Sequence, residues 1–185
     1  FTRLTIPRVS LLWPSNGYWV NSLTPTFNLS YLPEDDQGIR SSVLIINGIV
    51  NQTNSTAIIV NQPNNFTVSG FPDGRYNWTV NVTDITGLVG NTSERYFFVD
   101  TNQPSLVLNA PDGLTVITAN NVTFNFTVND TLDSSLTCNL SLDGDVDFSG
   151  EVSSGNTKIH YSLLSDGTHN WNVTCFDDAG NYNRS

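Results

Sequence analysis

A strand-and-turn segment that occurs twice is the feature that most constrains how this chain can fold. The first copy runs from Gly74 to Asp100, and a shorter second copy runs from Gly167 to Ser185. In both copies apolar residues alternate with polar ones, which is the period-two pattern of a half-buried β-strand. The alternating apolar residues are Trp78, Val80 and Val82 in the first copy and Trp171, Val173 and Cys175 in the second. This repeat predicts two β-rich units in one chain.

The two copies differ in how they end. After a turn-rich loop the first copy returns as an apolar run, Tyr96–Val99, and so predicts a hairpin with both arms. In the second copy Gly180-Asn181 repeats Gly90-Asn91 after a shorter loop, but no counterpart of Tyr96–Val99 follows. We therefore expect the second unit to lack its own final strand.

The remainder of the chain repeats in the same way. A first strand framed by prolines opens each unit, and alternating strands follow at Phe27–Tyr31 and Val122–Val128. The third strands end at the hairpin dipeptides Asn47-Gly48 and Asp143-Gly144. Less distinct middle strands are expected at 57–60 and 146–152. No helical periodicity is present.

These patterns predict an all-β fold of two tandem antiparallel β-sandwiches, the second without its own final strand. We expect residues 7–102 to form the first sandwich and residues 103–185 the incomplete second one. Residues 1–6 precede both as a separate strand. Phe1 is interpreted as a processed or trimmed start, because the chain has no methionine.

Composition excludes some classes of partner. The net charge is −10, and only 13% of the residues are charged, so no basic surface is available for a nucleic-acid backbone. No apolar run approaches the roughly 20 residues that a transmembrane helix needs. We expect no nucleic-acid partner, no transmembrane segment and no cofactor.

At the repeated segments the chain resembles the Ig-like, fibronectin-III-like repeats of prokaryotic surface proteins, especially those of archaea. The resemblance rests on Trp78–Asn91 and Trp171–Asn181, where a Trp-x-Val-x-(Val/Cys) strand precedes an Asp and a Gly-Asn pair. It implies an extracellular scaffold or adhesion role. The first unit departs from the pattern, since Ser42 and Val82 stand where the second unit has cysteines.

Cys138 and Cys175 are expected to form a disulfide. Each lies on the apolar face of its strand, and the two strands are neighbours in sandwiches of this kind. On the chain-entropy model such a bond contributes on the order of 3–4 kcal/mol. Two buried free thiols in a reducing compartment are the alternative.

The chain is rich in acceptor sequences for N-glycosylation. Thirteen Asn-x-Ser/Thr sequons are present, whereas chance placement would give about five. Many fall on strand faces opposite the apolar residues, which predicts a glycoprotein with covalent N-glycans; outward positions that simply favour Thr are the alternative. The acceptors are Asn28, Asn51, Asn54, Asn65, Asn77, Asn81, Asn91, Asn121, Asn125, Asn129, Asn139, Asn172 and Asn183.

Little in the sequence indicates catalysis or metal binding. His169 aligns with Tyr76 of the other unit, which favours a structural role, and no enzyme activity is expected. The carboxylates near Asp143 imitate the start of a calcium loop without its later ligands, so a solvated turn is favoured over a weak calcium site there or at 34–36. An isopeptide crosslink by the single lysine, Lys158, has no support.

The orphan segment before Pro7 completes the interpretation. It alternates, with Leu4 and Ile6 on one face, and looks like a closing strand without a sandwich of its own. We expect it to insert into the second unit of an identical subunit, so that copies join head to tail as an extracellular filament at the cell surface. The donor strand would consist of Phe1, Thr2, Arg3, Leu4, Thr5 and Ile6.

Two alternatives belong to other functional classes. The chain could be two repeats of a long tandem Ig-like surface protein or adhesin, in which residues 1–6 close the preceding repeat. It could also be a carbohydrate-binding accessory module, with Trp13, Tyr18 and Trp19 as its aromatic platform.

Overall fold

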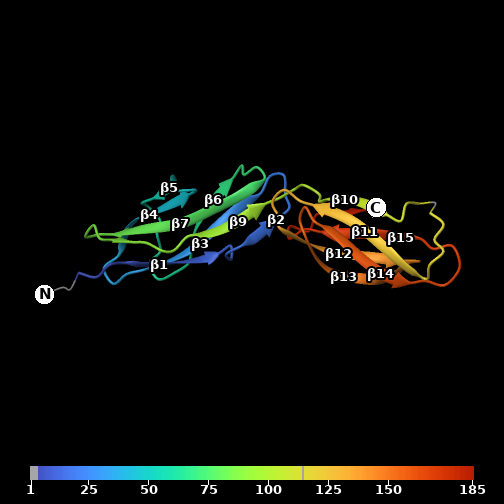
Figure 1. Cartoon of the computed structure of the whole chain (residues 1–185). Coiled ribbons are helices and arrows are strands. Elements are labelled where there is room, and N and C mark those ends of the chain that lie inside the picture. The colour runs from blue at the N-terminus through green and yellow to red at the C-terminus, as the bar shows by residue number, and fades with distance from the viewer. Residues whose placement is uncertain (1–3, 114) are drawn as a thin grey trace. The chain divides into compact units, whose positions relative to one another are not determined.

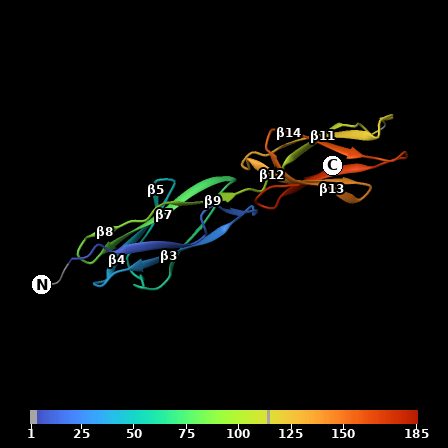
Figure 2. The ribbon, with the colours of Figure 1, turned by 60° about the horizontal axis from the view of Figure 1, so that its bottom comes forward.

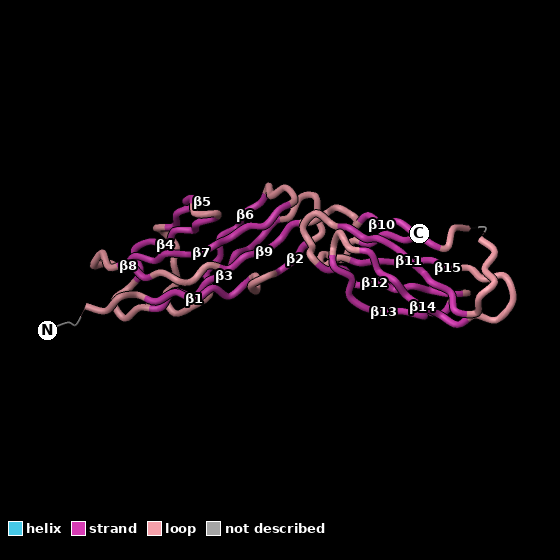
Figure 3. The backbone as a smooth tube through the Cα atoms, in the orientation of Figure 1, coloured by secondary structure: helices cyan, strands magenta, loops and turns pink. Residues whose placement is uncertain are grey.

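The protein, described by a computed structural model, consists of strands and loops that form two compact units. The structure describes residues 4–113 and 115–185, and every regular element in them is a β-strand (Figures 1 and 3). The units comprise Phe1–Asp100 and Thr101–Ser185, so they meet two residues before the expected boundary. The predicted all-β fold is confirmed. Within the described ranges no helix could span a membrane.

The first unit is a sandwich of two sheets. One sheet has the order β1-β3-β6, and the other has the order β2-β9-β7-β4-β5, with β8 paired to the end of β7 (Figures 1 and 2). All these pairs are antiparallel except β2 with β9, which is parallel. The strands are β1 (Arg8–Trp13), β2 (Tyr18–Val20), β3 (Thr26–Glu34), β4 (Ile39–Ile46), β5 (Ile49–Asn54), β6 (Asn64–Ser69), β7 (Gly74–Asp84), β8 (Val89–Gly90) and β9 (Arg95–Val99).

The second unit repeats this plan with fewer strands. One sheet has the order β10-β11-β14 and the other β13-β12-β15-β16. No counterpart of β2 or β9 occurs in the described part of this unit. The strands are β10 (Ser105–Ala110), β11 (Asn121–Asn129), β12 (Ser135–Leu142), β13 (Asp145–Ser153), β14 (Thr157–Leu163), β15 (Trp171–Phe176) and β16 (Tyr182–Arg184).

Each unit has its own core, built from the alternating residues of its two sheets. Because successive side chains of a strand face opposite ways, every second residue of β3 and β11 is buried. The first core is aromatic and surrounds Trp78 and Phe97, both 0% exposed. The second core is more aliphatic and contains the buried disulfide between Cys138 and Cys175.

The strand register explains where the cysteines lie. Cys138 of β12 is directly opposite Cys175 of β15, as Ser42 of β4 is opposite Val82 of β7 in the first unit. In place of the disulfide, the Ser42 hydroxyl lies 2.6 Å from the buried hydroxyl of Tyr31, so the polar atom has a partner. The same site is therefore satisfied by a covalent bond in one unit and by a hydrogen bond in the other.

The turn after the tryptophan strand corrects the alignment of the repeats. The backbone N–H of Gly87 donates to the Asp84 carbonyl at 3.2 Å, and the N–H of Gly180 donates to the Asp177 carbonyl at 3.3 Å. The counterpart of Gly180 is therefore Gly87, not Gly90, and the two loops have equal length. Both glycines have a positive φ, 94° and 87°, which other residues rarely adopt.

Pro7 and Pro104, the prolines that open the two units, support the corrected alignment. The Pro7 carbonyl approaches Gly90 so closely that a Cβ there would lie 1.9 Å from its oxygen. In the second unit Asn183 takes this place, and its side-chain amide donates to the Pro104 carbonyl at 2.9 Å. Identical Gly-Asn letters at 90 and 180 thus occupy different positions in the fold.

The middle of each unit is only partly as expected. No strand forms at 57–60, where one was predicted; the strand of that region is β5, which pairs with β4 through the Asn47-Gly48 turn. The predicted strand at 146–152 is present within β13. The edge strand β14 turns Ile159, Tyr161 and Leu163 outward.

Candidate functional site: a groove where the second unit lacks a strand

The second unit has an open sheet edge at the place where β9 closes the first. In the first unit β9 pairs with the start of β7, from Gly74 opposite Val99 to Trp78 opposite Arg95. The corresponding segment of the second unit, Gly167–Trp171, has no strand on that side among the described residues, and β16 covers only residues 174–176. The predicted absence of a counterpart to Tyr96–Val99 is therefore confirmed for the described residues, and β16 occupies the place that corresponds to β8.

A groove of about 580 Å³ lies along this open edge. Its floor is apolar and consists of Val122 and Phe124 from β11 and Leu142 from β12, all of which are at most 7% exposed. Leu164 and Trp171 line its sides, and the Trp171 ring stands edge-on to Phe124 with centroids 5.1 Å apart. A concave apolar surface of this kind favours an apolar occupant.

The first unit shows what fills such a space. The ring of Phe97 lies 4.3 Å from that of Phe27, 5.3 Å from that of Phe71 and 5.3 Å from that of Tyr76. Val99 is buried two residues further along the same strand. By strand register and turn position, the residues that face the empty counterpart of Phe97 are Val122, Leu164 and His169.

The rim of the groove carries a hydrogen-bonded histidine. His169 Nδ1 lies 2.6 Å from Asp143 Oδ2, and its Nε2 lies 2.9 Å from the Ser165 carbonyl oxygen. Both partners are acceptors, so the ring is best satisfied when both nitrogens carry a proton. The hydrogen bond to Asp143, followed by that to Ser165, raises the pKa of His169. The backbone N–H of Asn170, followed by the hydrogen bond from His169, lowers the pKa of Asp143.

A loop on the other side of the groove corresponds to β2. The N–H of Tyr18 donates to the Ser15 carbonyl, and the N–H of Thr115 donates to the Asp112 carbonyl, so Thr115–Ile117 matches Tyr18–Val20. In the first unit this segment is a strand paired with β9. In the second unit it forms no strand, and Val116 is 89% exposed. This segment shows no strand pattern in the sequence, although its offset from Pro111 equals that of Tyr18 from Pro14.

The described part of the expected donor segment is exposed. Leu4 and Ile6 are 62% and 65% exposed, and residues 4–6 belong to no strand. Thr5 donates its hydroxyl hydrogen to Asp36 Oδ1 at 2.7 Å. The other expected donor residues, Phe1, Thr2 and Arg3, lie outside the described residues.

None of the thirteen sequon asparagines is fully buried. Asn183 is the least suited to carry a glycan, because its Nδ2 is the atom that donates to Pro104. Seven are partly exposed, namely Asn54, Asn77, Asn81, Asn125, Asn139, Asn172 and Asn183. The most exposed acceptors are Asn28, Asn51, Asn65, Asn91, Asn121 and Asn129.

The other residues considered from the sequence are engaged in local contacts. Asp143 Oδ1 accepts the N–H of Asn170 at 2.8 Å. Asp147 lies 2.7 Å from His160 Nε2, and the Lys158 ammonium lies 4.3 Å from the Phe148 ring centroid. Asp35, the centre of the other acidic run, accepts the N–H groups of residues 37 and 38. These side chains therefore make local contacts within turns and edge strands.

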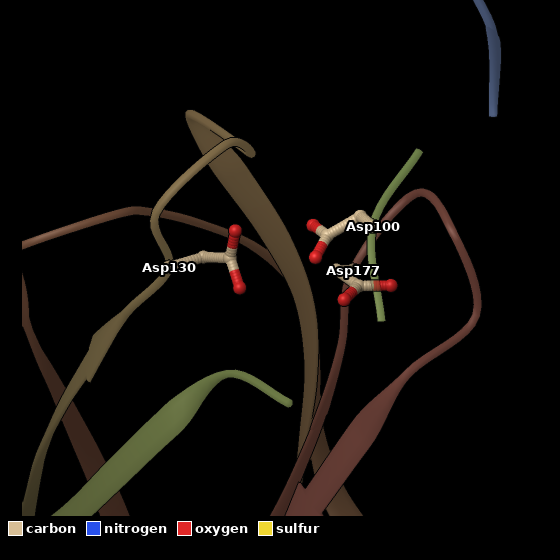
Figure 4. A group of neighbouring side chains, drawn as sticks. All are labelled: Asp100, Asp130 and Asp177. Atoms are coloured by element: carbon tan, nitrogen blue, oxygen red, sulfur yellow. The ribbon is translucent and has the colours of Figure 1, made fainter. Parts of the chain in front are cut away.

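An acidic group at one end of the second unit was not anticipated. Burial, together with the nearby charge of Asp130, raises the pKa of Asp177, and Asp177 also accepts two hydrogen bonds from Asn181. Burial and then the charge of Asp133 raise the pKa of Asp178. Figure 4 shows the carboxylates of Asp130 and Asp177; the third labelled side chain belongs to Asp100 of the first unit. The carboxylates of this group come from separate segments of the sequence, so no local motif indicated them.

Comparison with protein-family models finds no match, and comparison with curated proteins finds none either. Among solved structures the chain is similar to the fibronectin(III)-like modules of Clostridium thermocellum CbhA. The TM-score is 0.56 and the identity 17%, over 96% of this chain and 90% of that chain. Both units have a fibronectin(III)-like fold.

Two further structures show weaker likeness. The D00-D0 domain of intimin has a TM-score of 0.41 and 13% identity, over 90% of this chain and 91% of that one. A 1.5-MDa bacterial ice-binding adhesin has a TM-score of 0.39 and 20% identity, and the match covers 98% of this chain and 63% of that one. At these identities the comparisons concern the fold, and archaeal origin and a filament role remain expectations.

Proposed function

We propose that the chain is a non-catalytic structural part of an extracellular surface protein, built from tandem fibronectin(III)-like modules. The observation that carries this proposal is the presence of two such sandwiches in series, each with its own core. The similarity to the CbhA modules extends over 96% of this chain and so includes residues of both units. Sandwich folds host many functions, so the proposal of an extracellular surface protein also rests on the disulfide and the sequons.

The disulfide is the first of these two features. Bonds such as Cys138–Cys175 persist in oxidising compartments and are rare in a reducing cytosol. The partly or fully exposed sequons agree with a surface that carries N-glycans, which we propose as covalent partners. Both features support a location outside the cell.

Surface labelling of intact cells tests this location. A membrane-impermeant amine reagent should label the chain at Lys158 before lysis, and freshly isolated protein should contain no alkylatable thiol. Labelling of a known cytosolic protein serves as the control. Protein that is labelled only after lysis and carries two free thiols would contradict the proposal.

A second candidate function is a filament subunit joined by strand donation. The specific observation is the groove along Gly167–Trp171, together with the exposed apolar side chains of Leu4 and Ile6. We propose that the N-terminal segment of one copy fills the groove of the next. This contact uses different surfaces on its two sides, so it propagates rather than closing into a dimer.

Assembly of the full chain tests strand donation. Polymers should form in a concentration-dependent way and be absent from Leu4→Asn, because that change places an unpaired amide in an apolar groove. Thr5→Asn, on the opposite strand face, is the matched control and should still polymerise. Wild-type protein that stays monomeric at every concentration would exclude this candidate and leave the surface-module proposal intact.

The tandem-repeat alternative differs in the source of the closing strand. In that arrangement, further residues of a longer polypeptide close the groove in cis, and residues 1–6 close a preceding repeat. The carbohydrate-binding alternative receives no support from its expected platform. Trp19 stacks on Phe98 with centroids 3.9 Å apart, and Tyr18 packs against the core, so these rings stabilise their own unit.

A further inference from the structure

The closed first unit serves as a template for the open second unit. β9 contributes two buried side chains, Phe97 and Val99, separated by one residue that faces the other way. Its residues pair in antiparallel register with β7, Phe97 opposite Tyr76 and Val99 opposite Gly74. The counterparts of these β7 positions are His169 and Gly167. In both units an Asp-Gly turn lies at the same distance before the tryptophan.

We propose that residues Thr2–Ile6 of a second copy pair antiparallel with Gly167–Trp171, with Leu4 opposite His169 and Ile6 opposite Gly167. This inference rests on the proposed strand donation and assigns its register. Leu4 then takes the place of Phe97, beside Val122 and Leu164, and Ile6 takes the place of Val99. Thr5 and Arg3 face outward, as Phe98 and Tyr96 do in the first unit.

The other registers are unfavourable for separate physical reasons. A shift by one residue would turn Arg3 and Thr5 into the apolar groove and expose both aliphatic side chains. If residues 6 and 8 of the donor took these two places instead, Arg8 would lie in the place of Val99. Pro7 would then lie within the pairing strand, where it has no N–H to donate. If residues 2 and 4 took these places, the small polar side chain of Thr2 would lie in the larger space that corresponds to Phe97.

Charge favours this donor and acceptor. Residues 101–185 contain ten Asp and Glu but two Lys and Arg, whereas residues 1–6 contain Arg3 and no acidic residue. Asp112 and Asp166 line the groove itself. A donor segment with a positive charge is therefore attracted to the unit that holds the excess of negative charge.

Insertion should also create a second new strand. β2 pairs in parallel with β9, Tyr18 opposite Phe97 and Val20 opposite Val99. Its counterpart Thr115–Ile117 lines the groove but has no strand to pair with among the described residues of this unit. Once Leu4 and Ile6 of the second copy are in place, Thr115–Ile117 can form the parallel pair, and the exposed Val116 lies against Thr5.

Disulfide trapping in the full chain tests the register. Thr5 and Thr168 are directly opposite and face outward in the proposed pairing, so Thr5→Cys combined with Thr168→Cys should form a ladder of crosslinked oligomers with oxidised glutathione. Arg3→Cys combined with Thr168→Cys is the matched control, displaced by two residues on the same face, and should not form the ladder. The native Cys138–Cys175 bond remains in both and is distinguished by peptide mapping.

Hydrogen exchange tests the recruitment of the second strand. Backbone amides of residues 115–117 should exchange more slowly in wild-type polymer than in monomeric Leu4→Asn protein. A synthetic FTRLTI peptide added to that monomer should restore the protection, and a peptide with Phe in place of Leu should bind more tightly. Unchanged exchange at 115–117 in a crosslinked polymer would overturn the recruitment.

The outcomes separate this inference from the proposal on which it rests. A ladder from the displaced pair instead of the aligned pair would overturn the register while strand donation stands. Monomeric wild-type protein, or a groove that is protected only when the polypeptide extends beyond Ser185, would overturn donation itself. In neither case is the surface-module proposal affected.

Discussion

At the scale of single residues, the two units solve the same problem with different chemistry. Asn47 Oδ1 and Asp143 Oδ1 each accept the N–H of the residue immediately before the tryptophan, at 2.9 Å and 2.8 Å. Asp143 has a second carboxylate oxygen, which accepts from His169. Tyr76, the counterpart of His169, instead donates its hydroxyl hydrogen to the Pro72 carbonyl at 2.8 Å. The change from the amide of Asn47 to the carboxylate of Asp143 thus accompanies the change from Tyr76 to His169.

The contact between His169 and Asp143 predicts how the stability of the second unit depends on pH. The pKa of His169 is raised in the folded state, so the contribution of this contact is fully present below the unfolded value of about 6.5. It is lost as the pH rises through the folded pKa. An NMR titration of the full chain should show the raised value, and Asp143→Asn should lower it. An unchanged His169 pKa in that variant would show that Asp143 is not its cause.

The turn glycines lead to a second prediction. Gly87→Ala and Gly180→Ala should each destabilise their unit by about 1 kcal/mol, because alanine is strained at a positive φ. Gly113→Ala is the control, since Gly113 does not have such a φ and has open space around it. Chemical denaturation of each variant measures the effect. Equal stability of Gly180→Ala and the wild type would contradict the expected strain at this positive φ.

At the scale of strands, closure of the first unit depends on β9. Besides pairing with β7, it holds β2 in the sheet, where β2 has no other neighbour among the strands that the structure describes. The second unit shows the corresponding state without that strand: a groove, and a loop in place of the counterpart of β2. The two units therefore illustrate the closed and open forms of one architecture.

Truncation of the β9 aromatic should move the first unit toward the open form. Phe97→Ala should cost about 3–5 kcal/mol of unfolding free energy, as for other buried aromatic residues. It should also speed amide exchange in Tyr18–Val20. Phe98→Ala, which removes a partly exposed ring stacked on Trp19, is the control and should cost less. Unchanged exchange in β2 despite the lost stability would contradict its dependence on β9.

The alternating strands could be predicted from the sequence because period-two burial is a local property of the chain. The Cys138–Cys175 pairing followed from this periodicity together with the neighbouring positions of the two strands in sandwiches of this kind. The alignment of the turn could not be read from the Gly-Asn letters, although the Asp-x-x-Gly spacing at 84–87 and 177–180 carried the correct signal. β2 could not be predicted, because its short segment becomes a strand only through a distant partner.

β14 shows a different limit of sequence reasoning. Its apolar residues Ile159, Tyr161 and Leu163 occupy the outward phase, while Lys158 and His160 are partly covered. Those two side chains find partners on β13, the ring of Phe148 and the carboxylate of Asp147. Periodicity gives the spacing of buried residues, but the phase here depends on specific contacts with another strand.

At the scale of the whole molecule, charge is distributed unevenly. Residues 1–100 have a formal net charge of −2, from seven acidic and five basic residues, and residues 101–185 have −8. The acidic excess should slow association with other anionic surfaces and favour basic partners. The sequon asparagines, by contrast, occur in both units.

Native protein should therefore be heavier than its polypeptide. Intact mass should exceed 20.3 kDa by several N-linked glycans, and enzymatic deglycosylation should remove the excess. Asn121→Gln should lower the mass by one glycan at an exposed acceptor, whereas Asn183→Gln should not change it. A native mass equal to that of the bare chain would exclude glycosylation.

The disulfide also gives the two units unequal extensibility under tension. Cys138 and Cys175 are 37 residues apart, and the chain between them cannot lengthen while the bond is intact. At about 3.3–3.6 Å per residue, some 120–130 Å of contour length is withheld when the second unit is pulled by its ends. Ser42 and Val82 provide no such tether in the first unit. Force spectroscopy should thus find a short and a long unfolding step, and a reductant should lengthen the short one.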